Sequence, residues 1–499
     1  MVIPYYGQMS EGATPPQHRA DALFALPNLP TRVALLGDPG GWRSDLSERL
    51  IEIADDPAGA DVVVADTDHL ARALATGAPN VIVDGTRKAS RALERGGFAV
   101  MRLLPVPVAG PPLMLLNLAS RRAARYGIEH ALSHPERWRA VRNRVAARLV
   151  GAGLRPPVGE LLSVATRSPG DPALLKVARD LGVPPGADWA MLVSPGSAVR
   201  RNAFLVFPRG QSRPGLVVKF GRMRGLDEHF AREERGASVL SATGGTASAR
   251  APEYRGRAER DGFWISVETA ASGTKLSSFL RAPAPRARRL VPLEAVADWL
   301  VRVARETAGR AGDLEPERAR LARDVLPDWE TLGIPADLIG AVARVPGSLQ
   351  HNDLAEENVI VDGAGFTVLD WEWAKAHGLP LGDLVYFGVH VLRLLDGALS
   401  EPDRERHFVA LLRGEAASSP ILFAWIRRLV GALELPPESV GAAVTLSLLD
   451  RGSLSARQRL SAEASTGAPL EAAFGERMAR LWLSVPGLGP AWDAWRRVS

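Results

Sequence analysis

The chain has 499 residues, of which 46% are hydrophobic and 23% are charged, and its formal net charge is +5. This composition excludes a disordered or fibrous protein, and the length corresponds to about three domains of roughly 150 residues each. The absence of cysteine excludes disulfides, zinc fingers, iron–sulfur clusters and thiolate catalysis. Only five of the basic residues are lysines, so a lysine at a position where chemistry needs an amine is distinctive.

The first residues and the most apolar stretch bear on the location of the protein. The sequence MVIPYYGQMSEG lacks a charged region followed by an apolar core, so we expect no secretory signal. Residues 103–116 are apolar, but they contain four prolines and are shorter than the about 20 residues that a membrane helix needs. We therefore predict a cytoplasmic protein without stable membrane insertion.

The N-terminal part predicts a lead-in at 1–30 and an α/β, Rossmann-like domain at 31–150. Short buried strands alternate with short helices, which is typical of a parallel sheet. The expected strands are 32–37, 61–65, 80–84 and 98–104, and the expected helices are 44–54, 67–75, 86–95 and, with a basic face, 113–151. The loop 37–41 has neither a G-x-G-x-x-G nor a Walker pattern, and Pro39 removes one N–H donor, so the role of this domain stays open.

The rest of the chain predicts a linker and two lobes around a cleft. Proline-rich stretches at 156–157 and 168–172 indicate a linker with a helix between them, at 151–185. Short strands and one helix at 227–241 then predict a small antiparallel lobe at 186–272. Its expected strands are 189–193, 202–207, 215–220, 252–257 and 263–268. Residues 273–499 are expected to be helical, except for 350–372.

Residues 349–372 carry the strongest signal for chemistry. The segment LQHNDLAEENVIVD places His351, Asp353 and Asn358 in a loop before an apolar strand at 359–361. A Gly-Ala-Gly turn and a second strand lead to Asp370, so we expect the hairpin to bring Asp353, Asn358 and Asp370 together. Two carboxylates and an amide oxygen suit Mg²⁺, which takes few protein oxygens and completes its shell with substrate phosphate and water.

This segment resembles the aminoglycoside phosphotransferase and choline-kinase-like branch of the protein-kinase fold. The family pattern H-x-D-x-x-x-x-N, followed by a strand and an Asp with an aromatic neighbour, stands here as His351-Asn-Asp353 to Asn358 and Asp370-Trp-Glu372. The resemblance implies an α/β N-terminal domain followed by an α+β, two-lobed protein-kinase-like domain whose C-terminal lobe, 273–499, is large and helical. It also implies that Asp353 is the catalytic base, that His351 braces the loop, and that Asn358 and Asp370 bind the Mg²⁺ that bridges the phosphates of ATP.

The resemblance further implies a lysine that holds the nucleotide phosphates. A kinase-like small lobe carries it on the third strand, and Lys219 in LVVKF fits that position. A lysine that protects an edge strand is the alternative. The glutamate partner is expected on the helix 227–241, where Glu233 suits the register better than Glu234.

The other nucleotide contacts are less well defined by the sequence. Gly196 and Ser197 fall where this family covers the phosphates, although an ordinary hairpin turn is the alternative. Glu268 and Ala271 fall where the linker between the lobes would contact adenine, and Glu268 could equally be a solvated strand end. Asp383 is interpreted as a helix cap.

The sequence therefore predicts an ATP- and Mg²⁺-dependent transfer of phosphate to a hydroxyl of a small molecule, such as an aminoglycoside-like compound, a sugar or an amino alcohol. GTP as the donor and the oligomeric state stay open. The alternatives are a nucleotide-binding pseudoenzyme or regulatory partner on a kinase-like scaffold, and a bifunctional enzyme with a second transferase in the first domain. The arginines at 121–148 lack interleaved aromatic residues, so we expect a solvated helix face and no nucleic-acid partner.

Overall fold

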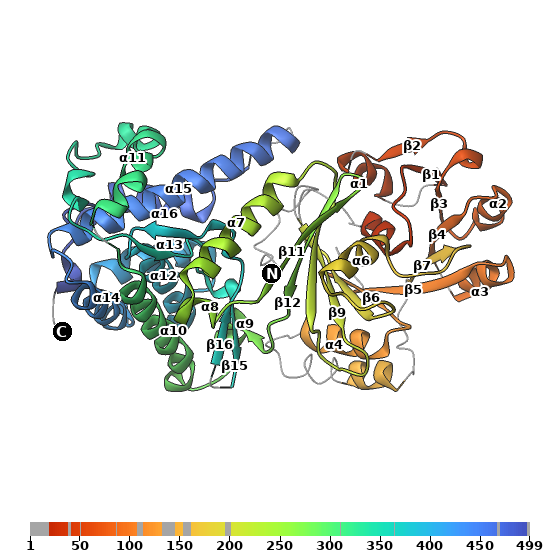
Figure 1. The fold of residues 1–499 in the computed structure, drawn as a ribbon, viewed down its shortest axis with the longest axis horizontal. Helices are drawn as coiled ribbons and strands as arrows, with labels where there is room; N and C mark the ends of the chain where they lie inside the picture. Colours follow the sequence, from red (N-terminus) through yellow and green to blue (C-terminus); the bar gives the residue numbers. More distant parts are fainter. Residues whose placement is uncertain are drawn as a thin grey trace. The chain divides into compact units, whose positions relative to one another are not determined.

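The computed structural model describes residues 19–37, 41–49, 51–85, 87–106, 113–131, 145–152, 161–194, 201–309, 311–363, 365–466 and 470–496. The chain divides into two compact units, which Figure 1 shows as ribbons. The sheet unit comprises residues 2–231 and 253–271, and the helical unit comprises residues 232–252 and 272–499. The helix α7 (Asp227–Thr243) contributes its first residues to one unit and the rest to the other.

A twelve-stranded mixed sheet organises the sheet unit, in the order β11-β12-β10-β9-β8-β6-β5-β7-β4-β3-β1-β2. Its strands are β1 (Arg32–Leu36), β2 (Glu52–Ala54), β3 (Val62–Ala65), β4 (Asn80–Gly85), β5 (Ala99–Val106), β6 (Met114–Asn117), β7 (Leu161–Thr166), β8 (Asp188–Leu192), β9 (Arg201–Phe207), β10 (Leu216–Gly221), β11 (Tyr254–Arg260) and β12 (Phe263–Thr269). The helices are α1 (Trp42–Glu48), α2 (Leu70–Ala75), α3 (Arg87–Arg95), α4 (Arg121–Ala131) and α6 (Ala173–Val177). Strands β1 to β4 pair in parallel, and the other pairs are antiparallel.

Strand β3 shows why the N-terminal part forms a sheet covered on both faces. All four of its residues are buried. Val62 and Val64 belong to one hydrophobic cluster, whereas Val63 and Ala65 belong to another. Because successive side chains of a strand point to opposite faces, an unbroken apolar run fills two cores at once. The parallel α/β part predicted from the sequence is therefore present.

Strands from both predicted N-terminal regions share one sheet. Met114, Leu115 and Leu116 of β6 pair with Leu192, Met191 and Ala190 of β8. The same hydrophobic cluster includes Val33 of β1 and Ile265 of β12. A continuous hydrogen-bonded sheet therefore runs across the predicted boundary between 31–150 and 186–272. That the two parts are separate domains stays a prediction.

Two predicted elements were wrong in type, and the helix expected at 44–54 ends at Glu48, with its last three residues forming strand β2. The helix expected between Pro157 and Ser168 is strand β7, which lies antiparallel between β4 and β5. The helical stretch expected from residue 113 begins instead with strand β6. Both are short apolar runs buried in the sheet, and such runs do not show the periodicity that separates a strand from a helix. The strand expected at 98–104 is β5, shifted towards the C-terminus.

The helical unit contains two short sheets besides its helices (Figure 1). Its strands are β13 (Thr274–Lys275), β14 (Ser348–Gln350), β15 (Val359–Asp362), β16 (Gly365–Val368) and β17 (Lys375–Gly378), and the sheets are β13-β15-β16 and β14-β17. Besides the end of α7, its helices are α8 (Gly245–Ser248), α9 (Leu276–Arg281), α10 (Arg286–Thr307), α11 (Glu315–Asp324), α12 (Gly382–Asp396), α13 (Glu401–Arg413), α14 (Ser419–Leu433), α15 (Ser439–Thr466) and α16 (Phe474–Ser484). One hydrophobic core joins these elements, which confirms the expected helical region.

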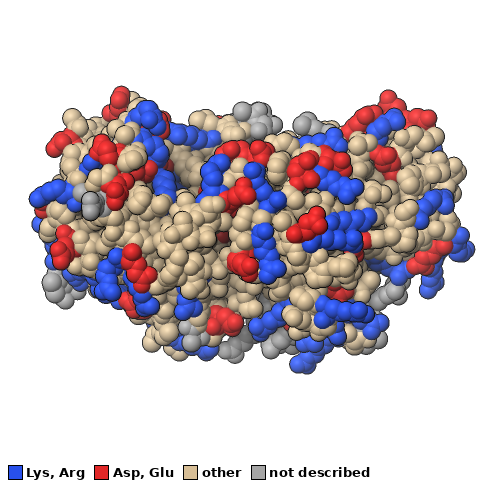
Figure 2. Space-filling view, in the orientation of Figure 1, with Lys and Arg blue, Asp and Glu red and all other residues tan. Residues whose placement is uncertain are grey.

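Charged side chains of both signs are mixed on the face shown in Figure 2, where Lys and Arg are interspersed with Asp and Glu. Among the described residues, no helix combines the length and the apolar character needed to cross a membrane.

Candidate active site

One buried carboxylate holds the backbone of the loop after β14. Asp383, at the start of α12, accepts the backbone N–H of His351 at 2.5 Å and that of Asn352 at 2.8 Å. The side chain of Asp383 does not cap the first residues of α12, so the prediction that it is a helix cap was wrong. Asn352 has a φ of 60°, a left-handed conformation that asparagine tolerates, and its amide donates to the carbonyl of Trp373 at 2.9 Å. The loop backbone is therefore fixed before any ligand arrives.

His351 is a brace inside this loop. Its Nδ1 accepts the backbone N–H of Asp353 at 3.2 Å, so the ring proton is on Nε2, which donates to the carbonyl of Leu369 at 2.7 Å. Burial lowers the pKa of His351, and the ring is neutral at physiological pH. Both ring nitrogens are thus occupied by the backbone, which supports the structural role that the family resemblance implied.

Asp353 is a partly exposed carboxylate with an unusual proton affinity. Burial raises its pKa to about 6, against the charge of Arg451, and the charges of Asp370 and Glu372 add to the increase. The side chain forms an ion pair with Arg451 of α15. A carboxylate with a pKa near physiological pH is suited to accept a proton in a reaction.

Asn358 presents a buried oxygen with no partner. Its Nδ2 donates to the backbone carbonyl of Asp353 at 2.8 Å. Among the described residues, no group hydrogen-bonds to its Oδ1, although this atom is buried. Leaving a buried acceptor unpaired costs about 1–3 kcal/mol, so such an atom calls for a ligand. An amide oxygen of this kind fits the magnesium site expected from the sequence.

The β15–β16 hairpin brings the second expected magnesium ligand to the same end of the sheet. Val359 pairs with Val368, and the N–H of Leu369 donates to the carbonyl of Asn358 at 2.8 Å. Asp370 follows directly, with a φ of 58°. Within the described part of the chain, no group of three or more His, Asp or Glu is placed to hold a metal. Asp353, Asn358 and Asp370 provide two carboxylates and one amide, and such a set suits Mg²⁺ bound together with phosphate.

The end of α7 packs closely on the residues after Asp370. A Cβ added to Gly236 would lie 2.0 Å from the carbonyl oxygen of Trp371, so only glycine allows this approach. The guanidinium of Arg232 lies 4.1 Å from the ring centroid of Trp373. The helix that carries Glu233 is thereby fixed against the segment that follows Asp370, within the helical unit.

Lys219 forms an ion pair inside the sheet unit. Its Nζ lies 3.0 Å from Oε2 of Glu268 on the adjacent strand β12, and both side chains are largely buried. The alternatives of an edge-strand lysine and a solvated Glu268 are therefore both excluded, since β10 lies between β9 and β12. Glu233 belongs to the helical unit, so its pairing with Lys219 stays a prediction.

The remaining nucleotide residues stay predictions. Gly196 and Ser197 lie outside the described residues. The described residues on either side are held by Asp21, whose Oδ1 accepts from Asn202 at 2.8 Å, while Asn202 accepts the N–H of Ser194 at 3.0 Å. Ala271 is the last residue of the sheet unit, and its neighbour Ala270 donates to the carbonyl of Gly215 at 2.9 Å.

Sequence reasoning missed Arg451, which contacts the candidate base. Its Nε lies 3.2 Å from the hydroxyl of Tyr386, its Nη1 lies 3.3 Å from the carbonyl of Asn352, and its Nη2 pairs with Asp353. Arg451 is almost one hundred residues downstream of the loop, in a chain rich in arginine, so no local pattern could have identified it. Only the packing of α15 against the loop reveals it.

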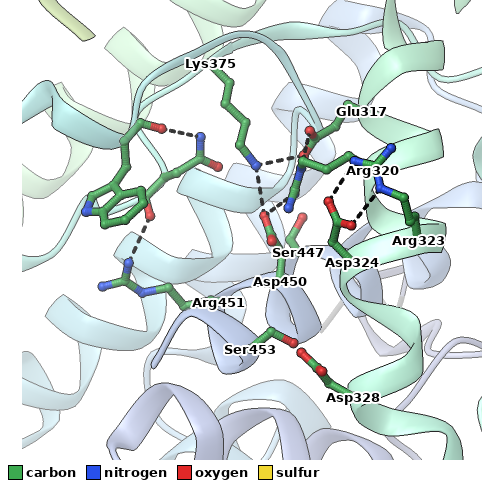
Figure 3. A network of polar contacts seen from close by, with 12 residues as sticks. Glu317, Arg320, Arg323, Asp324, Asp328, Lys375, Ser447, Asp450, Arg451 and Ser453 are labelled. Carbon is green, nitrogen blue, oxygen red and sulfur yellow. Dashed lines mark hydrogen bonds and ion pairs between the residues drawn. The ribbon is translucent and has the colours of Figure 1, made fainter. Parts of the chain in front are cut away.

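A cavity of about 300 Å³ opens beside the loop, within the helical unit. Asn352, Tyr386 and Arg451 line it on the side of Asp353, and Arg320, Lys375 and Asp450 line it further away. Figure 3 shows the polar network on its wall, with Lys375 and Arg320 directed at Glu317 and Asp450. A cavity of this size next to a candidate base could hold a small acceptor molecule.

No family model matches the chain, and no curated protein does. The solved structures similar to it include one from Ralstonia eutropha that carries the provisional name aminoglycoside phosphotransferase. It has 13% identity and a TM-score of 0.39, over 65% of this chain and 96% of that one. The bifunctional kinase-methyltransferase WbdD is also similar, with 13% identity and a TM-score of 0.29, over 84% of this chain and 87% of that one. These kinase-like neighbours agree in kind with the family that the motif resembles, but at such TM-scores the likeness carries no argument about function.

Proposed function

We propose that this chain transfers the γ-phosphate of ATP to a hydroxyl group of a small molecule. The observation that carries the proposal is the unpartnered buried Oδ1 of Asn358, on the same loop as a carboxylate whose pKa is raised to about 6. The unpaired Oδ1 of Asn358 is suited to bind a metal ion, and Asp353 is suited to accept the proton of a hydroxyl group. Together they favour phosphoryl transfer over a purely structural loop.

Asn358 and Asp370 are the residues that would hold Mg²⁺, and Lys219 would contact the nucleotide phosphates. The metal, when bound, neutralises charge on the phosphates. The chain's own contribution is to fix these groups: Asp383 anchors the loop, and His351 holds the backbone of Asp353 and of Leu369. Such preorganisation supplies most of the catalysis in this type of reaction.

Asp353 orients the acceptor and receives its proton. The acceptor oxygen forms a bond to the γ-phosphorus while the bond from that phosphorus to the β–γ bridging oxygen breaks. ADP leaves with the electron pair of the broken bond, and the hydroxyl proton passes to a carboxylate oxygen of Asp353. The product is a phosphate ester, and Asp353 returns its proton to solvent before the next cycle.

The substitution Asp353→Asn tests this function. We expect turnover to fall by about 10²–10⁴-fold, because the amide cannot accept the proton, while nucleotide binding stays intact. Turnover is measured as ADP release by purified protein with Mg²⁺ and a panel of sugars, sugar acids, amino alcohols and aminoglycosides. Nucleotide binding is measured by calorimetry. Glu357→Gln, which alters a nearby side chain paired with Lys275, is the matched control. Unchanged turnover in Asp353→Asn would refute the catalytic assignment.

One observation favours a nucleotide-binding pseudoenzyme as the second candidate. The carboxylate of Asp353 is already paired with Arg451, so the base is engaged in the absence of substrate. A pseudoenzyme should bind ATP and release no ADP with any acceptor of the panel. Acceptor-dependent ADP release would exclude it.

A further inference from the structure

A short 3₁₀ helix near the N-terminus packs on the strand that carries Lys219. This helix, η1 (Arg19–Ala25), is buried except for its first residue. The ring of its Phe24 lies against the ring of Phe220 on β10, with centroids 4.9 Å apart. Because successive side chains of a strand point to opposite faces, Phe220 and Lys219 lie on opposite faces of β10. The helix η1 therefore covers the reverse face of the lysine-bearing strand.

A carboxylate of η1 bonds to the same part of the sheet. Asp21 is fully buried, and its Oδ1 accepts from Nδ2 of Asn202 at 2.8 Å and from Nε of Arg222 at 3.2 Å. Asn202 of β9 pairs with Phe220, the residue after Lys219. Arg222 comes three residues after Lys219. One carboxylate oxygen thus ties β9 to the end of β10, close to the lysine.

The same two side chains also hold the chain that follows β8. Oδ1 of Asn202 accepts the backbone N–H of Ser194 at 3.0 Å. Nη1 of Arg222 donates to the carbonyl of Ser194 at 3.3 Å. Asp21 therefore orients two side chains that together fix the ends of three neighbouring strands, β8, β9 and β10.

The α/β part of the chain contributes further charges to this contact. Arg49, which follows α1, donates from Nη1 to Oδ1 of Asp21 at 2.7 Å, and its Nη2 lies 3.9 Å from Asp45. These groups and Arg222 are all buried. A buried ionic network is weak evidence for stability, since apolar side chains of similar volume often serve a core as well. Its directional bonds instead specify one geometry, here that of the strands around Lys219.

We propose that Asp21 is a positioning residue of the nucleotide site. Through Asn202 and Arg222 it sets the position of β10, and thereby the point at which the ammonium group of Lys219 meets the phosphates of ATP. This inference rests on the proposed phosphotransfer and concerns how its nucleotide site is built. It gives the N-terminal part of the chain, whose role the sequence left open, a task in binding ATP.

Calorimetric titrations of the full chain with ATP–Mg²⁺ and with adenosine test the proposal. Asp21→Asn removes the charge that holds Asn202 and Arg222. We expect ATP to bind about tenfold more weakly, because a charge-assisted bond from Lys219 to phosphate depends on its geometry. Adenosine has no phosphate, so its affinity should stay unchanged. Unchanged ATP affinity, or an equal loss for both ligands, would overturn the proposal.

A double variant shows whether Asp21 acts through the lysine. In a chain that already carries Lys219→Ala, the group to be positioned is gone. Adding Asp21→Asn should then weaken ATP binding by less than about twofold, which is the precision of such cycles. Additive losses in the double variant would show that Asp21 affects ATP binding by another route, and they would overturn the proposal.

A milder variant keeps the test decisive if Asp21→Asn does not fold. Asn202→Ala leaves the charges of the network in place and removes the bond between Asp21 and β9. It should weaken ATP binding about three- to tenfold and leave adenosine binding unchanged, and unchanged ATP affinity would overturn the proposal. Asp61→Asn is the matched control, on a carboxylate of the same unit that accepts the N–H groups of Thr31 and Arg32 at 2.8 and 3.0 Å. It should keep the full affinity for ATP.

The outcomes separate this inference from the proposed function. A natural chain that binds no ATP would refute both. ATP affinity that falls in Lys219→Ala, but not in Asp21→Asn or Asn202→Ala, would overturn the positioning role alone. ATP affinity that depends on Asp21, in a chain that releases no ADP with any acceptor, would support the positioning role and refute the phosphotransferase.

Discussion

Two carboxylates three residues apart in the same loop have pKa values that are shifted in opposite directions. Asp353 pairs with Arg451, and its pKa is raised to about 6. Burial also raises the pKa of Glu356, but the charge and hydrogen bond of His390 and the charge of Arg393 outweigh it and bring the pKa down to about 2. The distances are short in the second case, 2.8 Å to Nδ1 of His390 and 2.6 Å to Nη2 of Arg393.

The difference arises from the neighbours that each carboxylate has. Glu356 accepts from the side chains of His390 and Arg393, and this favours its charged form. Asp353 faces one arginine and also feels Asp370 and Glu372, so ionising it is less favourable. Burial alone does not decide whether an acid is structural or reactive; the sign and number of the charges around it do.

Removing the charge of Glu356 should have the largest effect on stability. Glu356→Gln leaves Arg393 buried without its counter-charge, and we expect the free energy of unfolding to fall by about 3–5 kcal/mol. Urea unfolding followed by circular dichroism measures it. Glu357→Gln, one residue later and paired with the partly exposed Lys275 at 3.2 Å, should cost at most about 1 kcal/mol. Equal losses in the two variants would contradict the comparison.

The lowered pKa of Glu356 also predicts how acid affects the stability of the fold. The pKa of Glu356 is about 2 in the folded protein and 4.5 as its ordinary value. A lowered pKa contributes stability that is complete above about pH 4.5 and is lost as the pH falls towards 2. Unfolding titrations between these values should show a larger acid dependence for the natural chain than for Glu356→Gln.

The anchor of the loop should have an intermediate effect. Asp383→Asn keeps one acceptor oxygen and loses the charge that holds the N–H groups of His351 and Asn352, so we expect a loss of about 1–3 kcal/mol in stability. Turnover should fall as well, because the loop that positions Asp353 is loosened. Chemical unfolding and ADP release on the same preparation measure both. A stable variant with full activity would show that the loop does not need this anchor.

The pH dependence of the reaction should be the smallest effect. Because the base form of Asp353 is lost below a pKa of about 6, kcat/KM should fall about tenfold for each pH unit below that value. Arg451 lowers this pKa, so Arg451→Gln should move the acidic limb to higher pH. A pH–rate profile of both proteins measures the shift. A limb that moves to lower pH would contradict the proposed electrostatics.

Local patterns in the sequence predicted much of the fold and part of the site. The alternating strands of the N-terminal part and the hairpin from Val359 to Val368 follow from periodicity and turn residues, and both are present. Strand β7 could not be told from a helix, because its partners β4 and β5 are distant in the sequence. Nor could the pair of Lys219 and Glu268 be foreseen, since it depends on which strands become neighbours.

The candidate catalytic loop was predictable because its side chains contact their own backbone. His351, Asp353 and Asn358 form a pattern within eight residues, and their contacts are mostly local. Arg451 reaches the same loop from another helix, and nothing near it in the sequence reveals that contact. Motifs therefore identified the candidate reactive groups, whereas Arg451, whose charge lowers the pKa of Asp353, was visible only in the folded chain.

The pairing of β6 with β8 affects how this protein can be divided for study. The backbone groups of residues 190–192 are hydrogen-bonded to residues 114–116 on one side and to β9 on the other. A shortened chain that began at residue 186 would turn this inner strand into an apolar edge. Exposed edges of this kind associate with other chains, so such a fragment should aggregate. Experiments on the C-terminal part will therefore need the N-terminal strands as well.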